Sequence, residues 1–258
     1  MLTFVGLGLY GTRDITLRGK DAVDKADYVF AEFYTSKLLG ASVEDLEKFF
    51  GKKITLLSRE EVEKGKILIE SASKGNTVLL VAGDPMVATT HVSLKILAEE
   101  RGIKTEVIHN SSIITAAPGM LGLQHYKFGR IVSIPFPQAN YFPTSVYDFL
   151  AQNMKMGLHT LLLLDINPRP MTANEGMEIL LKMEEKKKLG IINGDTLIAV
   201  VARAGAPDAA VKAGYMKDML KENFGPPLHT LVIPGKLHFA EAEALVKLAH
   251  APKDILEE

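Results

Sequence analysis

Short apolar runs alternate with segments of helical periodicity along most of the chain. Such runs predict strands, and between many of them apolar positions recur every three to four residues, as on one face of a helix. The predicted strands are Leu2–Gly8, Tyr28–Glu32, Ile54–Leu57, Thr77–Ala82, Glu106–His109, Ile131–Pro135, Thr160–Ile166, Thr196–Ala202 and Thr230–Ile233. Strands that alternate with helices are typical of an α/β protein with mostly parallel strands.

Three helix starts carry a capping signal. Ser42, Ser58 and Thr172 are each followed three residues later by Asp or Glu. The hydroxyl of such a residue accepts a hydrogen bond from a backbone N–H at the start of the helix. We therefore expect helices to begin directly after these three residues, and a last helix where apolar residues recur at helical spacing from Phe239 to Ala249.

The segment between His109 and Pro143 is the best candidate for a linker, because it concentrates glycine and proline with only short periodic pieces. We therefore expect two α/β domains, residues 1–110 and 111–258. The 258 residues contain 47% hydrophobic residues, which is enough for sizeable cores.

Composition removes several classes of function. The chain has no cysteine, which excludes disulfides, thiolate metal sites and a cysteine nucleophile and fits a cytoplasmic protein. A formal net charge of −1 gives no basic footprint for nucleic acid. No apolar run has the length of a membrane span, and the first residues show no secretory signal. The histidines lack metal-ligand spacing, so no metal is expected.

Glycines and small polar residues follow several predicted strands. In an open α/β sheet, ligands bind beyond the carboxyl ends of the strands. The candidate segments are Gly6–Gly11, Gly83–Pro85, His109–Ser112, Asp165–Pro168 and Arg203–Ala206. Glycines and small polar residues in both halves of the chain favour a shared ligand site.

Gly6, Gly8 and Gly11 fit the glycine pattern of dinucleotide-binding folds, which predicts a nicotinamide-dependent oxidoreductase. In that fold the helix opens inside the motif, whereas here it is expected near Asp14. A tight turn after the strand explains the same glycines, so both interpretations stay open.

Gly83-Asp84-Pro85 is ordinary turn chemistry, since glycine is conformationally permissive and proline fixes φ. It also suits a ligand: Gly83 leaves space, Pro85 stiffens the loop, and Asp84 offers acceptor oxygens to hydroxyls or an amine. On this basis Asp84→Ala is expected to weaken ligand binding and to leave the fold intact.

Four motifs resemble the tetrapyrrole-methylase superfamily: V-G-L-G at 5–8, D-I-T-L-R-G at 14–19, A-D-Y-V-F-A-E at 26–32 and G-D-P at 83–85. The resemblance implies a two-domain tetrapyrrole-methylase-like fold with a ligand cleft between the domains, S-adenosyl-L-methionine as cofactor and a homodimer. Another C-methyltransferase of this superfamily, acting on a corrinoid precursor, is the nearest alternative.

A longer set of motifs resembles the superfamily's diphthamide-biosynthesis methyltransferases. It includes F-A-E-F-Y-T-S at 30–36, G-D-P-M-V-A-T-T-H at 83–91, M-T-A-N-E at 171–175 and P-G-K-L-H at 234–238. This resemblance implies trimethylation of the amino group on a 3-amino-3-carboxypropyl-modified histidine of translation elongation factor 2. The segment 135–141 matches loosely, which puts the substrate side in doubt.

The family's cofactor contacts carry over to eight positions of this sequence: Leu9, Asp84, Val87, Ser112, Ile113, Leu164, Ala204 and His229. Most of them lie at strand ends. We assign no catalytic residue, because methyl transfer to an amine mainly needs alignment. Asp14, Tyr34 and Asp165 are substrate-side hypotheses, since a carboxylate or aromatic face suits a quaternary ammonium.

Overall fold

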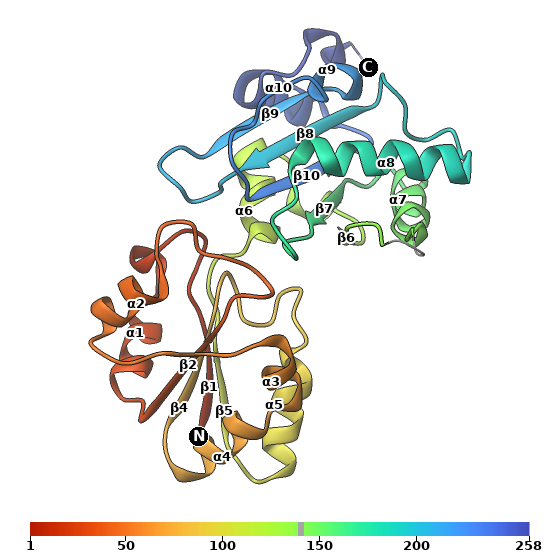
Figure 1. Cartoon of the computed structure of the whole chain (residues 1–258). Coiled ribbons are helices and arrows are strands. Elements are labelled where there is room, and N and C mark those ends of the chain that lie inside the picture. The colour runs from red at the N-terminus through yellow and green to blue at the C-terminus, as the bar shows by residue number, and fades with distance from the viewer. Residues whose placement is uncertain (139–141, 258) are drawn as a thin grey trace. The chain divides into compact units, whose positions relative to one another are not determined.

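The computed structural model describes residues 1–138 and 142–257. The chain divides into two compact units, Met1–Ile113 and Ile114–Glu258. Each unit contains a five-stranded sheet with helices packed against it (Figure 1).

The sheet of the first unit is parallel throughout, with the strand order β3-β2-β4-β1-β5. The central strands β1 and β4 are buried at every residue, as strands covered on both faces must be. The strands are β1 (Leu2–Gly6), β2 (Tyr28–Glu32), β3 (Thr55–Leu56), β4 (Thr77–Val81) and β5 (Thr105–Ile108).

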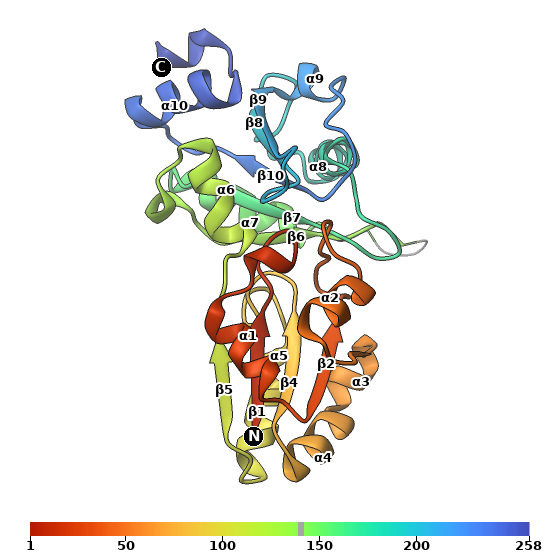
Figure 2. The same cartoon turned by 90° about the vertical axis from the view of Figure 1, so that its left-hand side faces the viewer.

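Helices cover both faces of this sheet (Figure 2). On one face α1 and α2 pack over a core that contains Val23, Leu46 and Phe50. On the other face α3, α4 and α5 enclose a core that contains Leu68 and Leu94. The elements are η1 (Thr12–Asp14), α1 (Leu17–Asp24), α2 (Val43–Phe50), α3 (Arg59–Lys64), α4 (Lys66–Lys74) and α5 (His91–Glu100).

The sheet of the second unit has the order β6-β7-β10-β8-β9, and only the β6–β7 pair is parallel. The expectation of mostly parallel strands is therefore wrong for this unit, because β10 runs antiparallel to both β7 and β8. Its strands are β6 (Val132–Ile134), β7 (Thr160–Leu164), β8 (Leu197–Ala202), β9 (Ala210–Tyr215) and β10 (His229–Ile233).

Strand β9 is missing from the sequence prediction. Its sequence, AVKAGY, has small residues and an internal glycine, which weaken the signal of a strand. It pairs with β8 in register from Leu197↔Tyr215 to Ala202↔Ala210. The connection between the two strands is too short for a parallel crossover, so the pair forms an antiparallel hairpin.

Helices also cover both faces of the second sheet. The helices α7, α8 and α9 share one apolar core with β6, β7, β8 and β10. In Figure 2, α6 and α10 lie on the face opposite α8. The elements are α6 (Ile113–Leu121), η2 (His125–Lys127), α7 (Ser145–Lys155), α8 (Ala173–Lys187), α9 (Met216–Met219), α10 (Phe239–Ala249) and η3 (Lys253–Leu256).

The three capping predictions are confirmed. Ser42, Ser58 and Thr172 each accept a hydrogen bond from the backbone N–H three residues later, at the starts of α2, α3 and α8. The predicted last helix is α10, which spans Phe239–Ala249. Short-range signals of this kind need no tertiary contact to act.

A buried carboxylate fastens α10 to the chain before it. Glu241 is 1% exposed and accepts hydrogen bonds from Gln124 N (2.8 Å), His238 N (2.9 Å), the ring of His159 (3.0 Å) and the Lys127 ammonium. Burial alone would raise the pKa of Glu241, but these donors outweigh burial and lower the pKa to about 2. The carboxylate is therefore charged at neutral pH and fully partnered.

Among the described residues, no helix is long and apolar enough to cross a membrane.

Candidate functional site

Three loops meet at the carboxyl ends of β1, β4 and β5 in the first unit. Gly8 and Gly83 exchange two backbone hydrogen bonds, of 2.8 and 3.2 Å, which join the loop after β1 to the loop after β4. Both glycines have positive φ, +79° and +74°, a conformation that side chains disfavour. The chain leaves the sheet at this point, so β1 ends at Gly6 and not at Gly8 as predicted.

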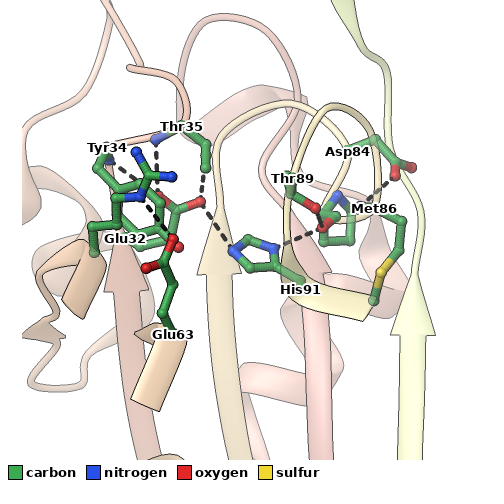
Figure 3. Close-up of polar contacts among 10 residues, drawn as sticks. Glu32, Tyr34, Thr35, Glu63, Asp84, Met86, Thr89 and His91 are labelled. Atoms are coloured by element: carbon green, nitrogen blue, oxygen red, sulfur yellow. Dashed lines mark hydrogen bonds and ion pairs between the residues drawn. The ribbon is translucent and has the colours of Figure 1, made fainter. Parts of the chain in front are cut away.

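Asp84 joins the loop after β4 to the loop after β5. Its carboxylate is 7% exposed, and one oxygen accepts from Met86 N at 2.9 Å (Figure 3). The other oxygen lies 2.8 Å from Nδ1 of His109 and accepts from Asn110 N at 3.2 Å. The sequence analysis offered a local turn or a ligand contact as the role of Asp84. The structure shows that it also fastens two loops of the protein.

Asn110 ties the end of β5 to the end of β1. Its side-chain amide donates to the carbonyl oxygens of Gly6 and Asp14, both at 2.9 Å. Its own oxygen accepts from Ser111 N at 2.7 Å. The sequence analysis noted Asn110 after a strand without a role. This half-buried amide holds the junction together. The local sequence does not reveal that role, because the two carbonyl oxygens that it binds lie 96 and 104 residues away.

The glycines after β1 are explained by contacts within the protein. A Cβ on Gly6 would lie 2.6 Å from the Gly83 oxygen, and one on Gly8 would lie 2.5 Å from Cβ of Asp14. The first full helix starts at Leu17, well after Gly11. The third glycine of a dinucleotide fingerprint opens the helix and packs it on the strand, and Gly11 does neither.

Space remains on the outer side of Gly83. A Cβ built there would meet only one heavy atom within 4 Å, the Ser111 oxygen at 4.0 Å. The predicted contact residues Leu9 and Val87 are half-buried on the adjoining loops, and Ser112 is buried. The structure thus brings the loops of all five predicted contacts of this unit (Leu9, Asp84, Val87, Ser112 and Ile113) to one end of the sheet.

The other three predicted contacts lie at the ends of the three central strands of the second sheet. β7 ends at Leu164, and Ala204 follows the end of β8. The antiparallel strand β10 begins where β8 ends, and its first residue, His229, pairs with Ala202. The antiparallel direction of β10, which the sequence did not predict, is therefore what places His229 beside the ends of two other strands.

Both ring nitrogens of His229 are engaged by the protein. Nδ1 accepts from Ala173 N at 3.0 Å, at the first residue of α8, and Nε2 donates to the Pro226 oxygen at 3.1 Å. Burial, aided by the charge of Arg203, lowers the pKa of His229. The ring is therefore neutral at physiological pH and is not available as a base.

Arg203 holds the loop that precedes β10. Its guanidinium donates to the carbonyl oxygens of Phe224 (2.6 Å) and Pro226 (2.8 Å) and to the Asp208 carboxylate (2.7 Å). It also sits at positive φ, +52°, directly before Ala204. Sequence analysis placed Arg203 at a strand end but gave it no function, because the carbonyl oxygens it binds are more than 20 residues away.

The three substrate-side residues, Asp14, Tyr34 and Asp165, stay predictions, and the structure shows how each is held within the protein. The carboxylate of Asp14 accepts from Tyr10 N (2.6 Å) and Gly11 N (3.2 Å), and that of Asp165 accepts from Phe136 N and Asn167 N (both 3.1 Å). Both carboxylates therefore stabilise loops of the protein by accepting backbone hydrogen bonds. Burial, together with the nearby Glu32, raises the pKa of Tyr34 to about 12, so its hydroxyl stays protonated. Residues 139–141 of the loosely matching segment lie outside the described residues.

In the described part of the chain, no group of three or more His, Asp or Glu side chains is arranged to hold a metal ion. In each unit the strand ends described above present backbone groups, small or apolar side chains, and polar side chains that already have partners in the protein. Such a surface can bind and orient a small molecule.

Comparison with known proteins connects these features. Residues 1–220 match the family described as tetrapyrrole (corrin/porphyrin) methylases. The diphthine synthase of Methanothermobacter thermautotrophicus is 51% identical over 260 residues, covering 100% of this chain and 98% of that protein. The diphthine synthase of Methanocaldococcus jannaschii is 50% identical over 251 residues, covering 95% and 97%. A crystal structure of diphthine synthase superposes with a TM-score of 0.92 at 41% identity, covering 99% and 98%.

Proposed function

The chain belongs to the tetrapyrrole methylase family, and we propose that within it the chain is a diphthine synthase that trimethylates an amino group on elongation factor 2. The chain is a methyltransferase. The observation that carries the finer assignment is the identity of about half of all residues with diphthine synthases along the whole chain.

The proposed substrate is a histidine of translation elongation factor 2 that carries a 3-amino-3-carboxypropyl group. The proposed methyl donor is S-adenosyl-L-methionine, which supplies a methyl group on a positively charged sulfur that the amine nitrogen displaces. Starting from the neutral amine, one proton leaves the nitrogen after each of the first two transfers. The third transfer goes to a tertiary amine, releases no proton and gives a trimethylammonium, and each transfer converts one donor to S-adenosyl-L-homocysteine. A neutral amine suffices as nucleophile, so the protein needs alignment more than a strong base.

The residues at the strand ends fit such a donor. The open space at Gly83, which a side chain would reduce, leaves room beside the half-buried Leu9 and Val87. Asp84 keeps that loop in place through its bonds to Met86 and Asn110. We propose cofactor contacts at these three positions and at Ser112, Ile113, Leu164, Ala204 and His229. His229, Asp14 and Asp165 already have hydrogen-bond partners in the protein, so none of them is assigned as a proton acceptor.

Mass spectrometry of the protein substrate tests the activity. Elongation factor 2 carrying the aminocarboxypropyl histidine is incubated with the enzyme and S-adenosylmethionine, and a gain of three methyl groups on that residue is expected. The unmodified factor is the control and gains none. A product with a single methyl group would contradict trimethylation, and labelling of a corrinoid precursor in place of the factor would favour the C-methyltransferase alternative.

Ligand-induced stabilisation tests the cofactor. S-adenosylhomocysteine is expected to raise the melting temperature, whereas NAD is expected to leave it unchanged, because the first α-helix begins at Leu17 and Gly11 does not open it. Stabilisation by NAD alone would restore the oxidoreductase interpretation.

We also propose that the enzyme is a homodimer and, because its substrate is a translation factor, that it works in the cytoplasm. Light scattering of the purified protein checks the first point, since a monomeric mass would refute it.

A further inference from the structure

A buried acid and a buried histidine lie under the loop that carries Asp84. Glu32 is the last residue of β2 and is 0% exposed, and His91 is the first residue of α5 and is 1% exposed. Figure 3 shows the two side chains pointing toward one another across the space between these elements. The site described above uses neither of them.

Glu32 is held in one orientation by the chain that follows it. One oxygen accepts from the backbone N–H groups of Tyr34 (3.0 Å) and Thr35 (3.1 Å). The other accepts from the Thr35 hydroxyl and faces His91. Three donors on one carboxylate fix its position, so Glu32 is a rigid partner for whatever lies opposite.

His91 holds the loop between β4 and α5, residues 82–90, which carries Asp84 and Val87 and is called the cofactor loop. Its Nδ1 lies 2.8 Å from the carbonyl oxygen of Pro85, and the Thr89 hydroxyl donates to the same oxygen at 2.9 Å. The ring also stacks on Phe4, with centroids 6.3 Å apart and planes at 27°. Because a carbonyl oxygen can only accept, Nδ1 must carry a hydrogen.

The other ring nitrogen faces Glu32. Nε2 lies 3.6 Å from Oε1 of Glu32, and it is one of the buried atoms that find no hydrogen-bond partner among the described residues. The Glu32 carboxylate, which its own donors hold in place, is therefore the polar group that lies against this edge of the ring.

We propose that Glu32 and His91 together form a positioning pair for the cofactor loop, with His91 as the positioning residue for methyl transfer. Glu32 orients the ring, the ring fixes the Pro85 carbonyl, and the turn that carries Asp84 and Val87 is thereby fixed from the β2 side. The idea rests on the proposed function, because it assigns this loop to the methyl donor.

The loop then has two anchors on opposite sides. Asp84 ties it to the end of β5 through Asn110 N and His109, and His91 ties its Pro85 carbonyl to Glu32 at the end of β2. Between the anchors the chain passes through Ala88 at positive φ, +56°. A loop in this disfavoured conformation keeps its shape only while its neighbours hold it.

Two substitutions of similar size separate the bond to Pro85 from the mere presence of a polar side chain. In His91→Asn, the amide nitrogen takes the place of Nδ1 and can still donate to the Pro85 oxygen. In His91→Gln, the amide reaches the place of Nε2, and the bond to Pro85 is lost. His250→Asn is the control, because His250 is exposed at the end of α10 and asparagine tolerates its φ of +55°.

The measurements are the dissociation constant of S-adenosylhomocysteine by calorimetry and the amide hydrogen exchange of Met86 and Val87. We expect His91→Gln to weaken binding about tenfold, the equivalent of one buried hydrogen bond, and to speed exchange at both amides. His91→Asn and His250→Asn are expected to bind within about threefold of the parent. Equal affinities for the Asn and Gln variants would overturn the proposal.

Exchange without ligand keeps the two proposals apart. If the parent protein is folded but binds no S-adenosylhomocysteine, the proposed function fails, and faster exchange of Met86 and Val87 in His91→Gln would still support the positioning role. If exchange of these amides is the same in all variants, the positioning role is wrong whatever the ligand does.

Discussion

Replacing Asp84 by alanine separates two roles of this carboxylate. A residue that only touches a ligand could be removed without loss of stability. The structure gives Asp84 three partners in the protein, namely Met86 N, Asn110 N and the ring of His109. The side chain of His109 is 69% exposed and can turn to water, but the two backbone N–H groups are part-buried and would lose their acceptor.

The expected loss of stability follows from these two groups. An unsatisfied buried donor costs about 1–1.5 kcal/mol, so the loss of an acceptor for two of them in Asp84→Ala should lower the free energy of unfolding by about 2–3 kcal/mol. For a unit of 113 residues, about 4 °C of melting temperature corresponds to each kcal/mol, which predicts a decrease of about 10 °C. Asp84→Asn keeps one oxygen and should lose about half as much.

Thermal unfolding followed by circular dichroism measures this loss, and calorimetry with S-adenosylhomocysteine measures the effect on binding. We expect Asp84→Ala to lower the melting temperature and to weaken binding at least about tenfold, because the loop that carries Val87 is released. Asp21→Ala, at an exposed position of α1, is the control. An unchanged melting temperature would refute the fastening role, and unchanged affinity would refute the contact.

Three further predictions concern stability. Because the pKa of Glu241 is lowered from 4.5 to about 2 in the folded state, its carboxylate stabilises the fold above pH 4.5, and this stability is lost as pH falls toward 2. The free energy of unfolding, measured by denaturant titration at several pH values in this window, should therefore change less with pH in Glu241→Gln than in the parent. Gly6→Ala should lower the free energy of unfolding by about 1–3 kcal/mol, and the melting temperature with it, because its Cβ would lie 2.6 Å from the Gly83 oxygen. Gly119→Ala should leave both unchanged, because its Cβ would have nothing within 4 Å. Arg203→Lys should speed hydrogen exchange at the amides of Gly225 and Leu228, because one ammonium cannot replace both Nη1, which donates to the Phe224 and Pro226 oxygens, and Nε, which donates to Asp208; unchanged exchange would contradict the role of Arg203 in holding this loop.

The first unit is the part of the fold that sequence reasoning predicted best. Its buried strands appear as apolar runs, and the helices between them show their caps at Ser42 and Ser58. Parallel strands with crossover helices follow from that alternation, because each crossover needs a helix-sized segment. Local spacing therefore carries enough information for this unit.

In the second unit, local patterns did not predict the direction of β10 or the presence of β9. Strand β10 pairs with β7 and β8 in the antiparallel direction, and no spacing within the strand itself records which partner it meets. Strand β9 was missed because its small residues gain their burial from β8, α9 and α10 and not from their own pattern. Strand propensity depends on neighbours more than on the strand itself.

The candidate site divides in the same way. Sequence alone determined that glycines, Asp84 and small residues follow the strands, because turn chemistry is local, and its motifs pointed to the methylase family. Only the tertiary structure decided that Asp84 and Asn110 fasten the loops and that His91 faces Glu32. Each of these bonds joins segments far apart in the chain, and a polar side chain does not reveal its partner until folding has brought that partner within hydrogen-bond distance and excluded water.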